Sequence, residues 1–343
     1  MAEEEISIQQ AIARVVEGNA LQADEMVQTM RKIMSGECTD AQIGGLLVAL
    51  RVKGETVEEI AAAAVVMREL ASGVTCQTTD LVDIVGTGGD GTSTFNVSTC
   101  SSLVAAAAGI KVAKHGNRAV SSSSGAADVL EAAGVNIDLD AEQVARCVDT
   151  VGLGFMFAPK HHGAMRHAIG PRKDLGMRTI FNVLGPLTNP ASAPRQLIGV
   201  YSNHLVVPIA EVLSKLGSQR AMVVHAEDGM DERSIGAATN VAELRGGKVT
   251  SYVIEPSMFA MSNTDTKKIK VDSAAESLAM VKQVLSNTPG PARDIVALNA
   301  GAAIYIAGIE DTHEKGVEKA LALIADGSAA KKLDELISCS NAC

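Results

Sequence analysis

The feature that most constrains this chain is a pair of consecutive units that each run from a short apolar strand through a polar loop into a helix. The first unit covers residues 81–108 and the second covers residues 110–133. Successive units of this kind build a parallel sheet covered by helices on both faces. The carboxyl ends of parallel strands meet at one edge, so the two loops are expected to lie side by side there.

The loop of the first unit has the composition of a phosphate site. Residues 86–94 are glycines, hydroxyl side chains and one carboxylate, and a helix begins around Asn96. Glycine lets backbone N–H groups approach a ligand, and a helix N-terminus supplies unpaired donors and partial positive charge. Asp90 would repel phosphate unless a metal or a sugar hydroxyl lies between them. The alternative is a plain turn with capping hydroxyls, because the loop matches neither the dinucleotide fingerprint nor the P-loop.

The second loop adds positive charge to the same edge. Residues 114–125 contain two cations, Lys114 and Arg118, together with an imidazole, an amide and a run of four serines. A solvated basic turn would explain the two cations but not the serines beside them. Two neighbouring loops of this composition fit a highly phosphorylated ligand at the edge of a parallel sheet.

The first 70 or so residues predict a set of amphipathic helices. Capping boxes mark helix starts and glycines mark helix ends, at Ser7 with Gln10, Thr39 with Gln42, Thr56 with Glu59, and at Gly36, Gly54 and Gly73. The apolar stripes of these helices exceed what one thin layer over a sheet domain needs. We therefore predict that this segment also forms a homodimer interface.

The rest of the chain continues the α/β pattern. Further strands are predicted at 154–158, 196–201 and 220–225, with helices at 140–151, 205–216 and within 273–337, and with an edge hairpin at 241–254.

Charge and composition narrow the classes of function. The formal net charge of −10 argues against a general nucleic-acid binder, which needs an electropositive face. No apolar run is long enough to span a membrane, and the acidic first residues do not begin a signal peptide. The six cysteines are scattered and show no metal-binding spacing, so free thiols in the cytoplasm are expected and a zinc site is not.

Five motifs, in order, resemble those of the anthranilate phosphoribosyltransferase family. They are Gly86-Thr87-Gly88-Gly89-Asp90, Asn96-Val97-Ser98-Thr99, Lys114-His115-Gly116-Asn117-Arg118, the stretch 178–190, and Gly229-Met230-Asp231-Glu232. The resemblance covers nearly the whole chain. It implies a small helical domain, built from residues 1–73 and an insertion near 170–195, and a large α/β domain at 74–343. The expected reaction joins 5-phospho-α-D-ribose 1-diphosphate (PRPP) to anthranilate and releases pyrophosphate, a step of tryptophan biosynthesis.

The resemblance also implies roles for single residues. Asp231 and Glu232 would hold Mg²⁺ with an oxygen from Ser98, although a solvated acidic loop is the usual explanation for such a cluster. Arg172 would pair with the anthranilate carboxylate, beside Gly86 and Asn117, where the alternative is an arginine on a helix surface. The PRPP cradle would consist of Gly86, Gly89, Asp90, Thr94, Asn96, Val97, Ser98, Thr99, Lys114, His115, Gly116, Asn117, Arg118, Ala119, Val120, Ser121, Ser122 and Ala126.

No single general base is expected, because the neutral amine of anthranilate is already a nucleophile. His161 and His162 are adjacent in sequence and are not expected to share a metal. The loop 157–163 is a candidate wall of the aromatic pocket, and Glu227 and Asp228 are expected at the surface.

Two other functions compete with this interpretation. A pyrimidine-nucleoside phosphorylase would share the fold and phosphate loop, but it would need neither Arg172 nor the pair Asp231 and Glu232. A nucleic-acid-binding protein of the same fold is opposed by the net negative charge and by the intact loops.

Overall fold

A seven-stranded sheet forms the centre of the molecule, with strand order β3-β2-β1-β4-β5-β6-β7. The computed structural model describes residues 5–119, 124–261 and 264–343. Strands β1 to β5 pair in parallel, and β6 and β7 add an antiparallel hairpin at the edge. The predicted α/β class is confirmed, and each predicted strand is present within a few residues. The bounds are β1 Leu81–Gly86, β2 Lys111–Gly116, β3 Leu153–Phe157, β4 Arg195–Gly199, β5 Arg220–Ala226, β6 Thr239–Arg245 and β7 Lys248–Ile254.

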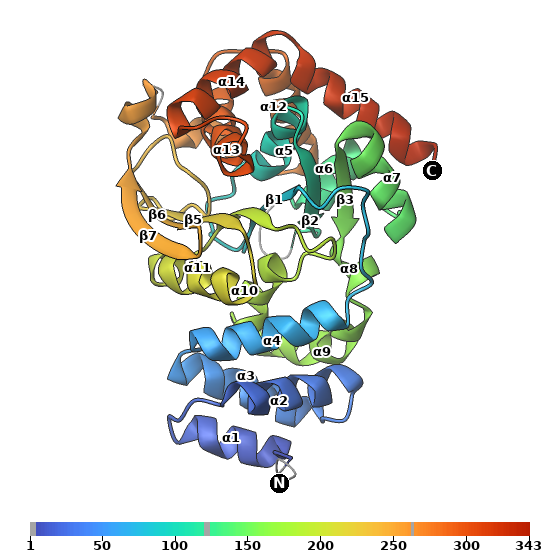
Figure 1. Ribbon diagram of the computed structural model, residues 1–343, viewed down its shortest axis with the longest axis vertical. Coiled ribbons are helices and arrows are strands. Elements are labelled where there is room, and N and C mark those ends of the chain that lie inside the picture. The colour runs from blue at the N-terminus through green and yellow to red at the C-terminus, as the bar shows by residue number, and fades with distance from the viewer. Residues whose placement is uncertain (1–4, 120–123, 262–263) are drawn as a thin grey trace.

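Helices cover both faces of this sheet (Figure 1). Neighbouring residues of one strand point to opposite faces, so Leu197 joins the core on one side and Ile198 joins the core on the other. On the first side lie α5 Val97–Ala107, α6 Ala126–Ala132, α12 Ala274–Leu285, α13 Pro291–Ala307, α14 His313–Ala325 and α15 Ser328–Asn341, with α7 Ala141–Val151 against β3. On the second side lies α11 Val206–Lys215, which also packs against the N-terminal helices.

Helices from two separate parts of the chain form a bundle at the end of the molecule that carries the N-terminus (Figure 1). They are α1 Ile8–Val16, α2 Ala23–Ser35, α3 Asp40–Lys53, α4 Val57–Glu69, α9 Arg166–Leu175 and α10 Ile180–Leu187. All three predicted capping boxes are present. The last two helices come from the middle of the chain, yet Ala168 and Phe181 share one core with the N-terminal helices.

One predicted helix end is wrong. Helix α4 does not reach Gly73 but ends at Glu69, with Leu70 as its cap. The chain leaves the helix early because its backbone finds tertiary partners instead. The N–H of Ser72 donates to His161 O at 2.8 Å, and the N–H of Val74 donates to Pro190 O at 3.0 Å.

Short helices complete the connections, namely α8 Ala158–His161 and 3-10 turns at Gly163–Met165, Asn203–Leu205, Pro256–Phe259 and Thr266–Ile269. Within the described residues, no helix combines the length and the apolar character that crossing a membrane requires.

Candidate active site

The carboxyl ends of β1, β2 and β4 bring the predicted loops together. Strand β1 lies between β2 and β4, and Gly86 at its end pairs with Gly199. The loop that follows β5 turns back over this edge. Asp231 in this loop contacts Gly88 of the glycine loop (residues 86–94), from which it is separated by 143 residues in the sequence. The site is therefore built from three separate parts of the chain.

Asp231 is tied to the glycine loop by backbone contacts. Its Oδ2 accepts a hydrogen bond from the N–H of Gly88 at 2.7 Å, and its own N–H donates to Asp90 Oδ2 at 3.4 Å. Asp90 is held in turn by Thr92, whose N–H and hydroxyl donate to the carboxylate at 3.1 and 2.5 Å. The carboxylate that is unexpected in a phosphate loop thus belongs to an acidic cluster.

The approach is close because two glycines leave room for it. A Cβ added at Gly86 would lie 2.4 Å from Asp231 Oδ2, and one at Gly199 would lie 1.4 Å from Asp231 O. Any other residue at these strand ends would displace Asp231.

Crowding shifts the titration of these carboxylates. Burial, followed by the charge of Asp90, raises the pKa of Asp231 to about 7. Burial, followed by the charge of Asp231, raises the pKa of Glu232 well above its usual range, and Lys114 opposes this shift. No ion pair within 4.0 Å reaches Asp90, Asp231 or Glu232 from the described residues. A cluster of oxygen ligands with unbalanced charge fits a hard divalent cation such as Mg²⁺.

Lys114 is the cation at the floor of this site. It is 2% exposed, and its Nζ donates to Ile84 O at 2.6 Å and to Ser98 Oγ at 3.3 Å. Burial lowers its pKa, while Asp83 and Glu232 raise it. The ammonium is thus fixed between the end of β1 and the first turn of α5.

Asn96 joins the two loops instead of standing free to meet a ligand. Its Oδ1 accepts hydrogen bonds from Ser277 Oγ at 2.8 Å and from Ser124 Oγ at 3.0 Å. The backbone N–H of Asn96 donates to Ser277 Oγ at 3.0 Å. Ser277 lies on α12, 181 residues away, and no local pattern could have placed it here.

The other residues of the first turn differ in what they offer. Val97 is buried and its N–H already donates to Phe95 O at 2.7 Å, so its contribution is to the core. The hydroxyl of Thr99 is buried with no partner among the described residues. Thr94 forms a β-bridge with Lys270, which anchors the far side of the glycine loop.

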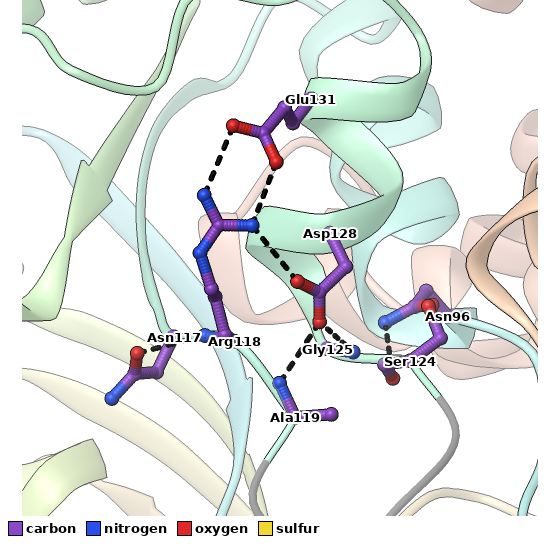
Figure 2. A network of polar contacts seen from close by, with 8 residues as sticks. All are labelled: Asn96, Asn117, Arg118, Ala119, Ser124, Gly125, Asp128 and Glu131. Carbon is purple, nitrogen blue, oxygen red and sulfur yellow. Dashed lines mark hydrogen bonds and ion pairs between the residues drawn. The ribbon is translucent and has the colours of Figure 1, made fainter.

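Arg118 is bound by two carboxylates of α6, as Figure 2 shows. Its guanidinium pairs with Glu131 at 2.7 and 2.9 Å and with Asp128 at 3.0 Å. Asp128 Oδ2 also accepts the N–H groups of Ala119 and Gly125, each at 2.9 Å. These contacts hold Arg118, Ala119 and Gly125 against α6, so the Arg118 side chain is engaged within the protein and does not stand free to meet a ligand.

Of the remaining residues predicted in the second loop, Gly116, Asn117 and Ala126 are described. Val120, Ser121 and Ser122 fall outside the described residues. Asn117 is exposed next to Gly116. A Cβ at Gly116 would lie 2.9 Å from the Phe155 ring and 3.2 Å from Ala126 Cβ, so α6 begins directly against the end of β2.

His115 is a buried neutral imidazole. Its ring centroid lies 5.1 Å from that of His162. Burial, with His162 and His161 as further causes, lowers the pKa of His115 to about 3. Its Nε2 has no partner among the described residues. His115 and the loop 157–163 are thus neighbours, and the lowered pKa makes this imidazole a weak base.

Arg172 lies half-buried near the end of α9. Its guanidinium carbon is 5.2 Å from the centroid of the Phe181 ring, and burial lowers its pKa. The described residues offer Arg172 no carboxylate within 4.0 Å. An arginine on a fully solvated surface would not be packed in this way.

Arg178 connects the helical bundle with the glycine loop. It donates a hydrogen bond to Gly89 O, and its guanidinium carbon lies 4.2 Å from the centroid of the Tyr201 ring. Arg178 belongs to the stretch 178–190 that carries the family resemblance. The composition of that stretch gave no reason to place Arg178 in the active site. Glu227 and Asp228 are exposed, as expected.

Comparisons with known proteins find similar sequences over nearly the whole chain. Residues 78–330 match the model of the glycosyl transferase family, a/b domain, and residues 9–71 match the helical bundle domain of that family. Anthranilate phosphoribosyltransferase of Thioalkalivibrio sulfidiphilus is 59% identical over 98% of this chain and 100% of that protein.

Two solved structures are also similar. The anthranilate phosphoribosyltransferase of Thermus thermophilus superposes with a TM-score of 0.91 at 41% identity, covering 96% of this chain and 99% of its own. The Saccharomyces cerevisiae enzyme in complex with PRPP and Mg gives a TM-score of 0.89 at 28% identity, covering 98% of each chain.

Proposed function

The chain belongs to the anthranilate phosphoribosyltransferase family, and on this basis we propose that the edge formed by β1, β2 and the loop after β5 is its active site. The protein transfers the 5-phosphoribosyl group of PRPP to the amine of anthranilate and releases pyrophosphate, with Mg²⁺ as cofactor, in tryptophan biosynthesis. The acidic cluster beside a glycine loop and a buried lysine is the observation that carries the assignment of the site.

Asp231 and Glu232, with Ser98 beside them, are the proposed Mg²⁺ ligands. When bound, Mg²⁺ supplies positive charge that stabilises the departing pyrophosphate. Gly88 and Asp90 fix the backbone and side chain of Asp231 before any ligand arrives. Lys114 adds a second positive charge on the same side.

The PRPP cradle is proposed at Gly86, Gly89, Asp90, Thr94, the first turn of α5 at 96–99, and residues 114–122 with Ala126. Backbone N–H groups at the start of α5 suit phosphate. Within this set, Asn96 and Arg118 are proposed to position the second loop (residues 114–125). The side chain of Asn96 already contacts Ser277, and that of Arg118 contacts Asp128 and Glu131. Val97 supports the cradle through the core, and Asp90 does so through its contact with Asp231. Donors to phosphate and ribose are proposed from Ser98, Thr99 and Lys114.

Anthranilate is proposed to bind near Gly86, Asn117 and Arg172. The amine is nucleophilic when neutral, so the protein has to orient it more than to deprotonate it. His115 stays neutral at physiological pH because its pKa lies at about 3. It therefore contributes a polar wall, and the reaction proton can leave to solvent.

Mixing the protein with anthranilate, PRPP and Mg²⁺ should abolish the fluorescence of anthranilate as the product forms. Excess EDTA should stop the reaction, because the acidic cluster would then lack the cation that it needs. Continuous fluorescence at fixed protein concentration measures both effects. Undiminished turnover in EDTA would contradict the metal assignment.

Arg172→Ala should weaken the response to anthranilate by about ten- to hundredfold, since it removes a charge-assisted hydrogen bond worth about 1.5–3 kcal/mol. Michaelis constants for both substrates measure this, and that for PRPP should barely change. Arg172→Lys should recover only part of the response to anthranilate, because lysine lacks the planar guanidinium that can form two parallel hydrogen bonds to a carboxylate. Equal increases in both constants would place Arg172 in another site.

A homodimer through the N-terminal helices is the proposed assembly. An open groove of about 700 Å³ crosses α1 and α3, and its lining includes Val15, Val48 and Leu175. Val16 and Val52 also line it and are 69% and 81% exposed, and a contiguous apolar patch of this kind marks an interaction surface. The boundary of this helical domain at residue 73, with its insertion near 170–195, stays a prediction.

Light scattering at micromolar concentration should give the mass of a dimer. Val52→Glu should lower that mass towards the monomer, because a charge would then be buried in the apolar interface. Glu318→Gln, at an exposed position on α14 in the α/β domain, serves as the control. A monomeric mass for the unaltered protein would contradict the proposal.

The proposed location is the cytoplasm. All six cysteines are free in the structure, and free thiols persist in a reducing compartment.

A further inference from the structure

Three cysteines that are far apart in the sequence meet at one place in the fold. Cys147 lies on α7, and Cys339 and Cys343 lie at the end of α15. Their sulfur atoms all lie within 4.8 Å of one another. Cys339 lies in the last turn of α15, and Cys343 follows two residues after the helix ends at Asn341.

The distances suit a shared metal ion. Zinc–sulfur bonds of about 2.3 Å place the sulfurs of a tetrahedral site about 3.8 Å apart. Cys147 Sγ and Cys343 Sγ are already 4.0 Å apart. Closing the set around one ion would therefore need shifts below about 1 Å, which side-chain torsions can supply.

A disulfide fits the same atoms less well. Its sulfurs bond at about 2.05 Å, so Cys147 and Cys343 would have to approach by about 2 Å and would leave Cys339 unused.

We propose that Cys147, Cys339 and Cys343 form a binding site for one thiophilic d¹⁰ cation, of which Zn²⁺ and Cd²⁺ are the test cases. The site lies on α7 and α15, away from the oxygen ligands at the edge of the sheet. Cys147 is fully buried, and Cys339 and Cys343 are partly exposed, so one side stays open for entry and for a water as fourth ligand. Each ligating thiol releases its proton to solvent.

The bound ion would clamp α15 onto α7. Hydrogen bonds already hold this end of the chain, from Asn341 Nδ2 to Gly134 O at 2.8 Å and from the N–H of Asn136 to Ser340 Oγ at 3.1 Å. The ion would add a direct link to α7. Helix α15 also packs against α5, whose first turn belongs to the proposed phosphate site. The clamp is therefore expected to stabilise the α/β domain without entering the chemistry.

The test is a titration of the reduced, metal-free full chain with Cd²⁺ in excess Mg²⁺. Thiolate-to-cadmium charge transfer in the near ultraviolet reports only sulfur ligands, and native mass spectrometry counts the ions. We expect one Cd²⁺ per chain, displaced by Zn²⁺, and a higher melting temperature in the bound form. Cys147→Ser and Cys339→Ser should each weaken binding by at least about 100-fold, since changing only a hydrogen-bond partner of a ligand already costs about 10- to 100-fold.

Cys38→Ser and Cys76→Ser are matched controls, because both cysteines are partly exposed and lie outside the cluster. Both should bind Cd²⁺ like the unaltered protein, and all four variants should keep transferase activity, which shows that they fold. The half-exposed Cys339 tests the site even if the buried Cys147 variant is unstable. Charge transfer that persists in Cys339→Ser, absence of binding at micromolar Cd²⁺, or a disulfide in place of the ion would each overturn the proposal.

Discussion

Asp231→Asn combined with Glu232→Gln should lower kcat/KM by at least about 1,000-fold, because one group aimed at developing charge contributes about 100- to 1,000-fold and two are lost. The expected cause is loss of the two carboxylates proposed to hold Mg²⁺. Both replacements keep the size of the side chain, and they relieve repulsion within the cluster, so the melting temperature should not fall. Steady-state kinetics over a range of Mg²⁺ concentrations and thermal denaturation measure the two effects.

Glu227→Gln is the control for this double variant. Glu227 lies in the same loop but is exposed, and the resemblance gives it no role. Its activity should stay within about twofold, as expected for a surface charge. If the double variant kept a tenth of the original activity, the acidic cluster would not be the metal site.

Gly199→Ala should lower kcat/KM by about 100-fold or more, since a displacement of about 1 Å at reacting groups can cost that much. The added Cβ would lie 1.4 Å from the carbonyl oxygen of Asp231, which is backbone and cannot rotate away. The loop after β5 must then move, and Asp231 loses its contact with Gly88. Stability should fall as well, by about 1–3 kcal/mol, as for other overpacked sites.

Gly170→Ala separates this clash from a general effect of alanine. Nothing lies within 4 Å of a Cβ at Gly170, which is inside helix α9, so this change should be neutral or slightly stabilising. A Gly199→Ala variant with normal activity and a normal melting temperature would show that the loop carrying Asp231 does not need its close approach to β4.

The elements of the fold were predictable because their signals are local. Short apolar segments bounded by turn residues predicted the strands, and capping residues such as Thr39 and Thr56 placed helix starts to the residue. The end of α4 was missed because it depends on hydrogen bonds to His161 and Pro190, which are distant in the sequence.

Less of the candidate site than of the fold could be predicted from the sequence, because its contacts join residues that are far apart along the chain. Glycines and cations indicated an anion site, but only the resemblance linked Asp231 to the glycine loop. Local composition gave Arg118 as a ligand for phosphate, while the structure pairs it with Asp128 and Glu131 on the next helix. The meeting of Cys147 with Cys343, across 196 residues, was likewise beyond any spacing rule.

The order of the strands has a consequence for folding. The chain builds β1, β2 and β3 outward in one direction, then crosses back to place β4 and β5 on the other side of β1. Asp231 can therefore meet Gly88 only after the polypeptide has closed a loop of 143 residues. Contacts of such high sequence separation form slowly, because the chain loses conformational entropy on closing the loop before the contact can stabilise it. The glycine loop is thus synthesised early. Asp231 and Glu232 reach it only when β4 and β5 have joined the sheet. Affinity for the divalent ion is therefore expected only in the fully folded protein.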